Sequence, residues 1–478
     1  MNYPLEVKIQ NPFLSQDTLD ELACTMADRM LAAIDAENNE DVIAICQKAR
    51  NEHMSMHDAY MVWSSQTQSY VYTRLGLEPL RAMLRQSVTP WLRPLAEQFR
   101  NGMTRESVTT LAKLVRTECI GTVIVEEDHD HMVFVLDGWS NQRLLKEGGY
   151  SSSSPNPLAI VAEADSLTGF IANTPVYITG IRMAELLMIE WLGYPAFVLE
   201  STGDGVERLV LFKNPTAVPQ TYFERVGAQK DAEKIDAACS VAGGRLFSDE
   251  ELKQLAQPYL QQAAIVFAEG RKDLAQGLSA LAKWEWYPGH HLGRDWITGQ
   301  LSYLEQHHPD LINDYFEKVY EHGCLDPMLD AVRQMDVASC VSWYAVLFHQ
   351  HTMRMRIEED ADKFTIITEP CGSGGRLLAE GAYDSESPKG FVRVKKRDTG
   401  GFQPNFQLDD FPAYCMHCPS TNRTILERGG PYIQLVDPDI RDGEIKGHCK
   451  FYMFKNPEAI PERLYTQVGL TKPASKIV

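Results

Sequence analysis

The feature of this 478-residue sequence that most constrains its fold is an internal repeat. Phe212-Lys213-Asn214-Pro215 recurs as Phe454-Lys455-Asn456-Pro457, and a proline and a Val-Gly pair follow both segments at the same spacings. Earlier in each half, Arg143-Leu144-Leu145 matches Arg376-Leu377-Leu378. A repeat of this length sets the architecture of a chain, so it is considered before any single motif.

One constant offset relates many further positions of the two halves. The matched pairs are Ser15 with Ser248, Leu19 with Leu252, Leu22 with Leu255, His57 with His290, Trp63 with Trp296, and Tyr70 with Tyr303. We therefore predict two tandem homologous units, residues 1–230 and 231–478. Their boundary is expected in the charged stretch Lys230-Asp231-Ala232-Glu233-Lys234.

Each half predicts helices first and strands second. Ser248-Asp249-Glu250-Glu251 has the pattern of a capping box at a helix start. A further helix is predicted through 311–319, with Gly323 as its C-terminal stop. Short β-branched or aromatic runs predict strands at 131–136, 209–212, 364–368 and 450–454. Because strands and helices scarcely alternate, we expect an α+β fold, with the two units forming an internal pseudo-dimer.

Composition narrows the class of partner. The formal net charge of −19 argues against nucleic acid and against an anionic membrane surface, because both attract basic patches. No apolar run has the length of a membrane span, and no signal peptide is visible at the start. We expect a cytoplasmic protein with a small-molecule substrate. The oligomeric state stays open, since an internal pseudo-dimer already supplies an interface.

Only the second half carries a cluster of cysteines and histidines. Its members are Cys371, Cys415, Cys418 and Cys449, with His417 and His448 adjoining. In the first half, Gly138 stands opposite Cys371, and Val206-Glu207 stands opposite His448-Cys449. Chemistry that is present in one copy and absent from the other points to a site, whereas shared residues point to the scaffold.

The cysteine pattern predicts a metal site. Cys415 and Cys418 form a C-x-x-C pair, which suits a soft metal ion, and sulfur or imidazole ligands from separate loops would complete a tetrahedron. Zinc is the first expectation, and iron or an iron–sulfur cluster is the open alternative. Three ligands would make zinc catalytic and four would make it structural. A redox dithiol and buried structural cysteines are the competing interpretations.

The glycine-rich run after Cys371 has two interpretations. It forms either an anion-binding turn with Cys371 as a nucleophile, or a tight turn that leads into a helix at 376–378.

The other histidines are either candidate site residues or structural residues. His291 and His448 are the candidate general acid–base groups, because histidine titrates near neutral pH. His290 is interpreted as a packed structural residue, since His57 shares its position. His349-Gln350-His351 has a spacing that suits a metal, but its counterparts in the first half are Arg116 and Glu118, and Asp128-His129-Asp130-His131 is interpreted as a solvated loop.

The second half resembles a known family. A strand that ends at Cys371, a later cysteine, and the closing Gly447-His448-Cys449-Lys450-Phe451 are similar to the aminothiazoline-carboxylate hydrolase-like proteins. The C-terminal end of this segment is also similar to that of the vinyl-reductase type of small-molecule-sensing domain. The resemblance covers about residues 300–455. It implies a compact α+β domain that acts on a small heteroatom-rich molecule, with Cys371, Cys415 or Cys418, and Cys449 at the site.

These observations lead to a functional hypothesis. We expect a metal-dependent hydrolase or lyase with its site in the second half, and a degenerate first half that serves as a scaffold. The alternatives are a non-catalytic small-molecule-binding or sensing protein with structural zinc, and an iron–sulfur redox protein.

Overall fold

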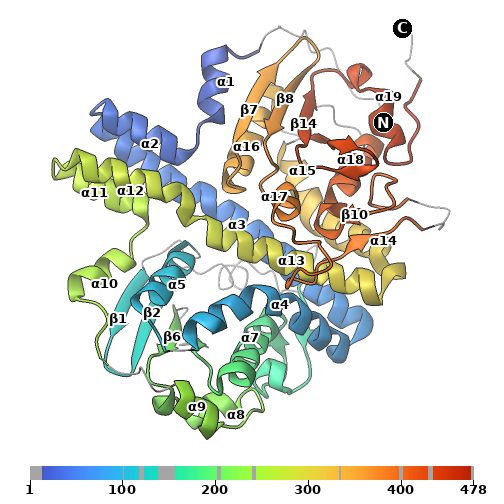
Figure 1. Cartoon of the computed structure of the whole chain (residues 1–478). Helices are drawn as coiled ribbons and strands as arrows, with labels where there is room; N and C mark the ends of the chain where they lie inside the picture. Colours follow the sequence, from blue (N-terminus) through green and yellow to red (C-terminus); the bar gives the residue numbers. More distant parts are fainter. Residues whose placement is uncertain are drawn as a thin grey trace. The chain divides into compact units, whose positions relative to one another are not determined.

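A computed structural model of the chain describes residues 13–100, 102–117, 123–137, 157–201, 206–238, 244–332, 335–397, 402–428 and 434–474 (Figure 1). The chain divides into two compact units. Unit 1 comprises Met1–Thr25, Phe316–Tyr383 and Val392–Val478, and unit 2 comprises Met26–Tyr315 and Asp384–Phe391. Among the described residues, no helix is long and apolar enough to cross a membrane.

Unit 2 is mainly helical. Its helices are α2 (Met26–Asp35), α3 (Asn39–Leu75), α4 (Leu77–Phe99), α5 (Arg105–Thr117), α7 (Tyr177–Leu192), α8 (Gln220–Glu224), α9 (Ala232–Ala238), α10 (Asp249–Leu255), α11 (Tyr259–Ala268), α12 (Lys272–Glu285), α13 (Tyr287–His307) and α14 (Ile312–Tyr315). Its strands are β1 (Val123–Glu127), β2 (His131–Asp137), β3 (Ile160–Val161), β4 (Thr174–Pro175), β5 (Phe197–Ser201) and β6 (Val206–Phe212).

Unit 1 holds a second sheet with fewer helices. Its helices are α1 (Gln16–Ala23), the π-helical segment η5 (Phe316–Leu325), α15 (Asp326–Val332), α16 (Val337–Gln350), α17 (Gly374–Ala379), the 3₁₀ segment η6 (Ala413–Met416), α18 (His417–Arg428) and α19 (Glu462–Thr466). Its strands are β7 (Met355–Glu359), β8 (Lys363–Thr368), β9 (Arg393–Val394), β10 (Phe411–Pro412), β11 (Leu435–Asp437), β12 (Ile440–Arg441), β13 (Glu444–Ile445) and β14 (Lys450–Phe454).

The main sheets of the two units have the same strand order. In unit 2 the order is β1-β2-β6-β5, and in unit 1 it is β7-β8-β14-β11, with every pair antiparallel. In chain order, each sheet therefore begins with a hairpin, and its last strand pairs with the second strand of that hairpin. The register also matches, because His131 pairs with Phe212 and Lys363 pairs with Phe454.

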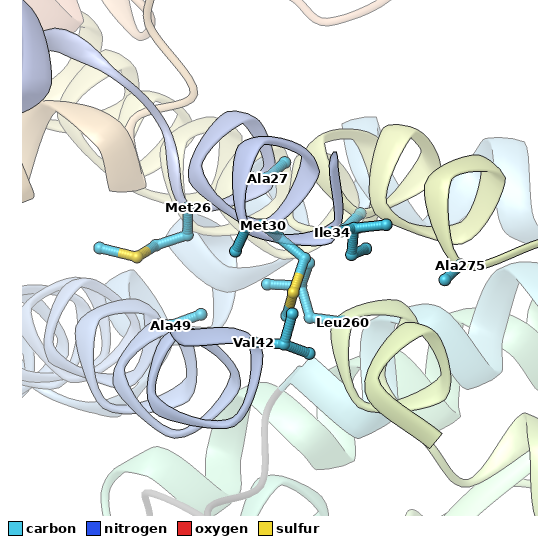
Figure 2. Close-up of a cluster of buried hydrophobic side chains, with 10 residues drawn as sticks. Met26, Ala27, Met30, Ile34, Val42, Ala49, Leu260 and Ala275 are labelled. Carbon is cyan, nitrogen blue, oxygen red and sulfur yellow. The ribbon is translucent and has the colours of Figure 1, made fainter. Parts of the chain in front are cut away.

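A helical core stabilises one end of unit 2. The long helix α3 and the helices α2, α11 and α12 enclose a buried apolar cluster, and Figure 2 shows Met30, Val42 and Leu260 meeting between them. Met30 and Ile34 have no exposed surface, and Val42 is 1% exposed. Apolar residues at helical spacing along α2 form the stripe that this packing buries.

In each unit, a buried lysine–glutamate pair anchors a segment that is distant in sequence. In unit 1, Lys455 Nζ lies 2.7 Å from Glu359 Oε1, and the glutamate also accepts hydrogen bonds from the backbone N–H groups of Phe13 (2.5 Å) and Leu14 (3.0 Å). These two residues lead into α1. The first helix of the chain is thereby fixed to a sheet built from the second half of the sequence.

Unit 2 has the same arrangement, but here the sheet comes from the first half of the sequence and the anchored segment from the second half. Lys213 Nζ lies 2.7 Å from Glu127 Oε1, and Glu127 accepts from the N–H groups of Leu246 (2.7 Å) and Phe247 (2.9 Å), just before α10. Both pairs are almost fully buried, so their charges are satisfied by each other and by backbone groups instead of by water.

The sequence-based predictions of fold class and strands agree with this structure. The mixed helical and sheet content confirms the α+β class, and β2, β6, β8 and β14 cover the four predicted strands. The prediction that Gly323 stops a helix was wrong, because η5 continues through this buried glycine to Leu325. The anchor at 143–145 and the position of Gly138 lie outside the described residues.

The compact units do not follow the predicted division at residue 230. Helix α1 belongs to unit 1, and helices α10 to α14 belong to unit 2, so each unit contains parts of both sequence halves. A sequence repeat and a compact unit need not coincide, and the repeat boundaries 1–230 and 231–478 stay a prediction.

We predict that Glu359→Gln lowers the free energy of unfolding by about 3–5 kcal/mol, because it leaves the Lys455 ammonium buried without a charged partner. Glu358→Gln is the matched control: its side chain is 54% exposed, and we expect a change within about 0.5 kcal/mol. Urea unfolding followed by circular dichroism measures both values. Equal effects of the two substitutions would contradict the anchoring role of the buried pair.

Candidate cysteine site

Cys371 lies in the turn that follows β8. Its N–H donates to the Gly447 carbonyl (2.8 Å), and its own carbonyl accepts from the N–H of Arg376 (2.9 Å). The turn thus closes directly onto α17, as the prediction of a tight turn leading into a helix requires. The Cys371 side chain is half-buried.

Cys449 reaches the same end of the sheet from the neighbouring strand. It immediately precedes β14, and its carbonyl accepts a hydrogen bond from the Thr368 hydroxyl (3.0 Å) at the end of β8. Because β8 and β14 are paired antiparallel, the end of one strand lies beside the beginning of the other. The register therefore brings Cys371 and Cys449 together although they are far apart in sequence.

The C-x-x-C pair lies at the junction of η6 and α18. Cys415 is buried in η6, and Cys418 is half-buried in the first turn of α18. His417 lies between them in sequence, with Nδ1 2.7 Å from the Tyr414 carbonyl oxygen and Nε2 3.5 Å from Cys418 Sγ. Since the carbonyl can only accept, Nδ1 carries the hydrogen and Nε2 is the unprotonated nitrogen of the neutral ring.

Glycines allow these segments to approach closely. A Cβ atom at Gly374 would lie 2.4 Å from Cys415 Sγ, so this thiol packs directly against the backbone at the start of α17. Gly447 has a φ of +82° and lies against the backbone of Gly375. The glycine-rich turn after Cys371 is therefore what lets the loop before β14 and the η6 thiol reach the end of β8.

The four cysteines form one electrostatic group. Burial raises the pKa values of Cys415, Cys418 and Cys449 above that of an ordinary thiol. Negative charge on neighbouring cysteines raises them further: Cys371 acts on the other three, and Cys418 interacts with all three of its partners. We refer to Cys371, Cys415, Cys418 and Cys449 as the thiol cluster.

The electrostatic effects on the buried thiols include a contribution from one described cation. Arg393 lowers the pKa of Cys415, but this effect is smaller than those of burial and of the other thiols. Among the described residues, no three or more histidine, cysteine or acidic side chains lie in an arrangement that could hold a metal ion. None of the described cysteines forms a disulfide.

Two neutral imidazoles lie near the thiol cluster. Burial lowers the pKa of His417 to about 4, against a smaller opposing effect of its hydrogen bond to Tyr414. Burial, with added repulsion from His417 and Arg376, lowers the pKa of His351 to about 3. His351 Nδ1 lies 2.8 Å from the hydroxyl of Ser373, within the turn after Cys371. Both rings are therefore uncharged near neutral pH.

Sequence reasoning gave His351 little weight because its counterpart in the first half is not a histidine. The signal that identifies it is its position at the end of α16, the helix that leads into the hairpin of β7 and β8.

The two predicted acid–base histidines lie in different surroundings. His448 is exposed beside Cys449 in unit 1. His291 lies on α13 in unit 2, where its Nδ1 is 2.7 Å from the Tyr287 carbonyl oxygen and its ring stacks on Tyr287 at 4.9 Å. Within unit 1, the structure groups His417 and His351 with the thiol cluster.

Other histidines singled out in the sequence have structural environments. His57 and His290 are 7% and 2% exposed, and His290 Nε2 lies 3.3 Å from the Tyr60 hydroxyl. The Asp128-His129-Asp130-His131 stretch forms the turn between β1 and β2, with backbone N–H groups bound to the Asp128 carboxylate. That turn is largely exposed.

Comparison with known proteins adds no assignment. No family model, no curated protein and no solved structure matches this chain.

We predict that Gly374→Ala destabilises the protein by about 1–3 kcal/mol, because the added methyl group overlaps Cys415 Sγ. Gly277→Ala is the control: it lies inside α12 with no atom near its Cβ position, so the same change should be neutral or stabilising. Urea unfolding of both variants tests the expectation. A neutral Gly374→Ala would show that Cys415 does not pack against this turn.

Proposed function

We propose that unit 1 binds one zinc ion through the thiolates of Cys371, Cys415, Cys418 and Cys449. The observation that supports this proposal most directly is geometric: three separate segments bring four cysteines to the end of β8, where Cys449 precedes the strand paired with β8 and Cys415 Sγ packs against Gly374. Zinc binds four sulfur ligands in a tetrahedron, and its positive charge stabilises the thiolates that burial alone disfavours.

The chemistry of the thiols argues against the competing interpretations. A redox dithiol depends on a lowered pKa in an electropositive setting. Here burial and neighbouring thiols raise the pKa values of Cys415, Cys418 and Cys449. Cysteines that served only as small apolar residues would have no reason to gather at one end of a sheet.

A shell of four thiolates is closed, so the proposed zinc has a structural role. The function that we propose is a cytoplasmic protein that binds or senses a small molecule and is stabilised by zinc. The resemblance to the vinyl-reductase type of sensing domain supports the same proposal. The shared strand order and the two equivalent lysine–glutamate pairs support an origin by tandem duplication.

A zinc-dependent hydrolase or lyase is the second candidate, favoured by a specific asymmetry of the thiol cluster. Cys415 and Cys449 are buried, whereas Cys371 and Cys418 are half-buried. If a half-buried thiol leaves the shell, water or a substrate heteroatom would take the open position. The unprotonated Nε2 of His417 would then be a nearby proton acceptor. The number of sulfur ligands separates the two candidates.

We predict about one zinc per chain in protein purified without oxygen, and loss of that metal in the double variant Cys415→Ser/Cys418→Ser. Cys340→Ser is the matched control, because Cys340, in α16, is also buried in unit 1 but its thiol faces the carbonyl of Val332 at the end of α15. Elemental analysis with acid-labile sulfide measurement gives both results. Iron with sulfide would replace the proposal by an iron–sulfur cluster, and wild-type protein without metal would overturn it.

A further inference from the structure

Unit 2 contains an apolar cavity that the thiol cluster does not involve. Its volume is about 140 Å³, and residues of α3, α4, α5, α7, α13 and the β2-β6-β5 part of the sheet surround it. Helix α4 packs against both α7 and α13 (Figure 1), which closes the space over the sheet. The cavity lies wholly within unit 2.

The cavity lining excludes a charged occupant. None of the described residues that surround it is an aspartate, glutamate, lysine, arginine or histidine. Its one amide, Gln68, already donates to the Ser64 hydroxyl (3.1 Å) and accepts from Thr179 (3.4 Å). An ion in this space would lose its hydration without gaining a partner, so the occupant must be uncharged.

The size and shape of the lining favour a small ring. An apolar protein cavity of about 150 Å³ stays dry and accepts benzene, which is close to the volume found here. The rings of Trp91 and Trp296 lie against each other with centroids 5.9 Å apart, and both line the cavity. Such indole faces are suited to an aromatic neighbour.

The location of the cavity within its unit matches that of the thiol cluster in the other unit. In unit 2, β4 ends at Pro175 and α7 begins at Tyr177. In unit 1, β10 ends at Pro412 and Tyr414 follows at the same spacing, in η6. Residues of α7 line the cavity, as the corresponding segment in unit 1 carries Cys415 and Cys418. The same part of the fold is thus apolar and hollow in one unit and rich in thiols in the other.

We propose that the cavity of unit 2 binds a small, uncharged aromatic molecule. The occupied cavity would be the sensing site of the chain, separate from the zinc site. This proposal does not depend on the metal: loss of zinc binding in unit 1 leaves the lining residues unchanged.

Isothermal titration of the full chain with acetophenone and benzoate tests this site, since the two probes are similar in shape but only benzoate carries a charge. We expect acetophenone to bind at least tenfold more tightly than benzoate, because the described lining offers no partner to a carboxylate.

A cavity-filling variant provides the second arm of the test. Ala184→Leu places three extra carbon atoms in the cavity from α7, and it should weaken acetophenone binding at least tenfold while circular dichroism and the melting temperature show a folded protein. If Ala184→Leu fails to fold, the comparison of acetophenone with benzoate alone decides. The proposal is overturned if acetophenone does not bind the wild-type protein at about 1 mM, if benzoate binds equally well, or if a folded Ala184→Leu binds acetophenone as the wild type does.

Discussion

The buried contact between a glutamate, a lysine and a distant backbone segment is the constraint on which both units depend. Glu359 and Glu127 each end the first strand of a hairpin, and each accepts two backbone N–H groups from a segment that leads into a helix of the other sequence half. Lys455, which follows β14, neutralises the Glu359 carboxylate, and Lys213, which follows β6, neutralises that of Glu127. A helix start that is anchored by a desolvated charge cannot shift without exposing an unpaired ion. Helices α1 and α10 are therefore each anchored to a sheet of the other sequence half, which is one reason why the compact units differ from the sequence halves.

The position of the thiol cluster depends on the main sheet of unit 1. The antiparallel pairing of β8 with β14 sets the ends of the two strands side by side, which places Cys371 near Cys449. Close backbone contacts at Gly374 and Gly447 then admit Cys415 and its helix. In unit 2 the matching part of the fold holds apolar side chains around a cavity. We interpret the two units as one architecture used in two ways, with metal in one and a small apolar ligand in the other.

The sequence predicted the elements of this structure better than their assembly. The strands and the α+β class were accessible because alternation and β-branched runs are local signals. The grouping of the four cysteines was suggested by their absence from the first half. Three features were not accessible in this way. The placement of α1 on the second sheet depends on the long-range contact of Glu359 with Phe13 and Leu14. The continuation of a π-helical segment through Gly323 depends on burial of that glycine. His351 joins the cysteine site only because α16 ends beside the turn after Cys371.

The coordination shell of the proposed zinc ion tests the central claim most directly. X-ray absorption at the zinc edge, on full-length protein purified without oxygen, should show four sulfur atoms at about 2.3 Å and no lighter ligand. That result would establish a closed thiolate site in unit 1. A shell that contains nitrogen or oxygen in place of one or more sulfurs would contradict the closed site and favour catalysis, and a shell without sulfur would contradict any role of the thiol cluster in metal binding.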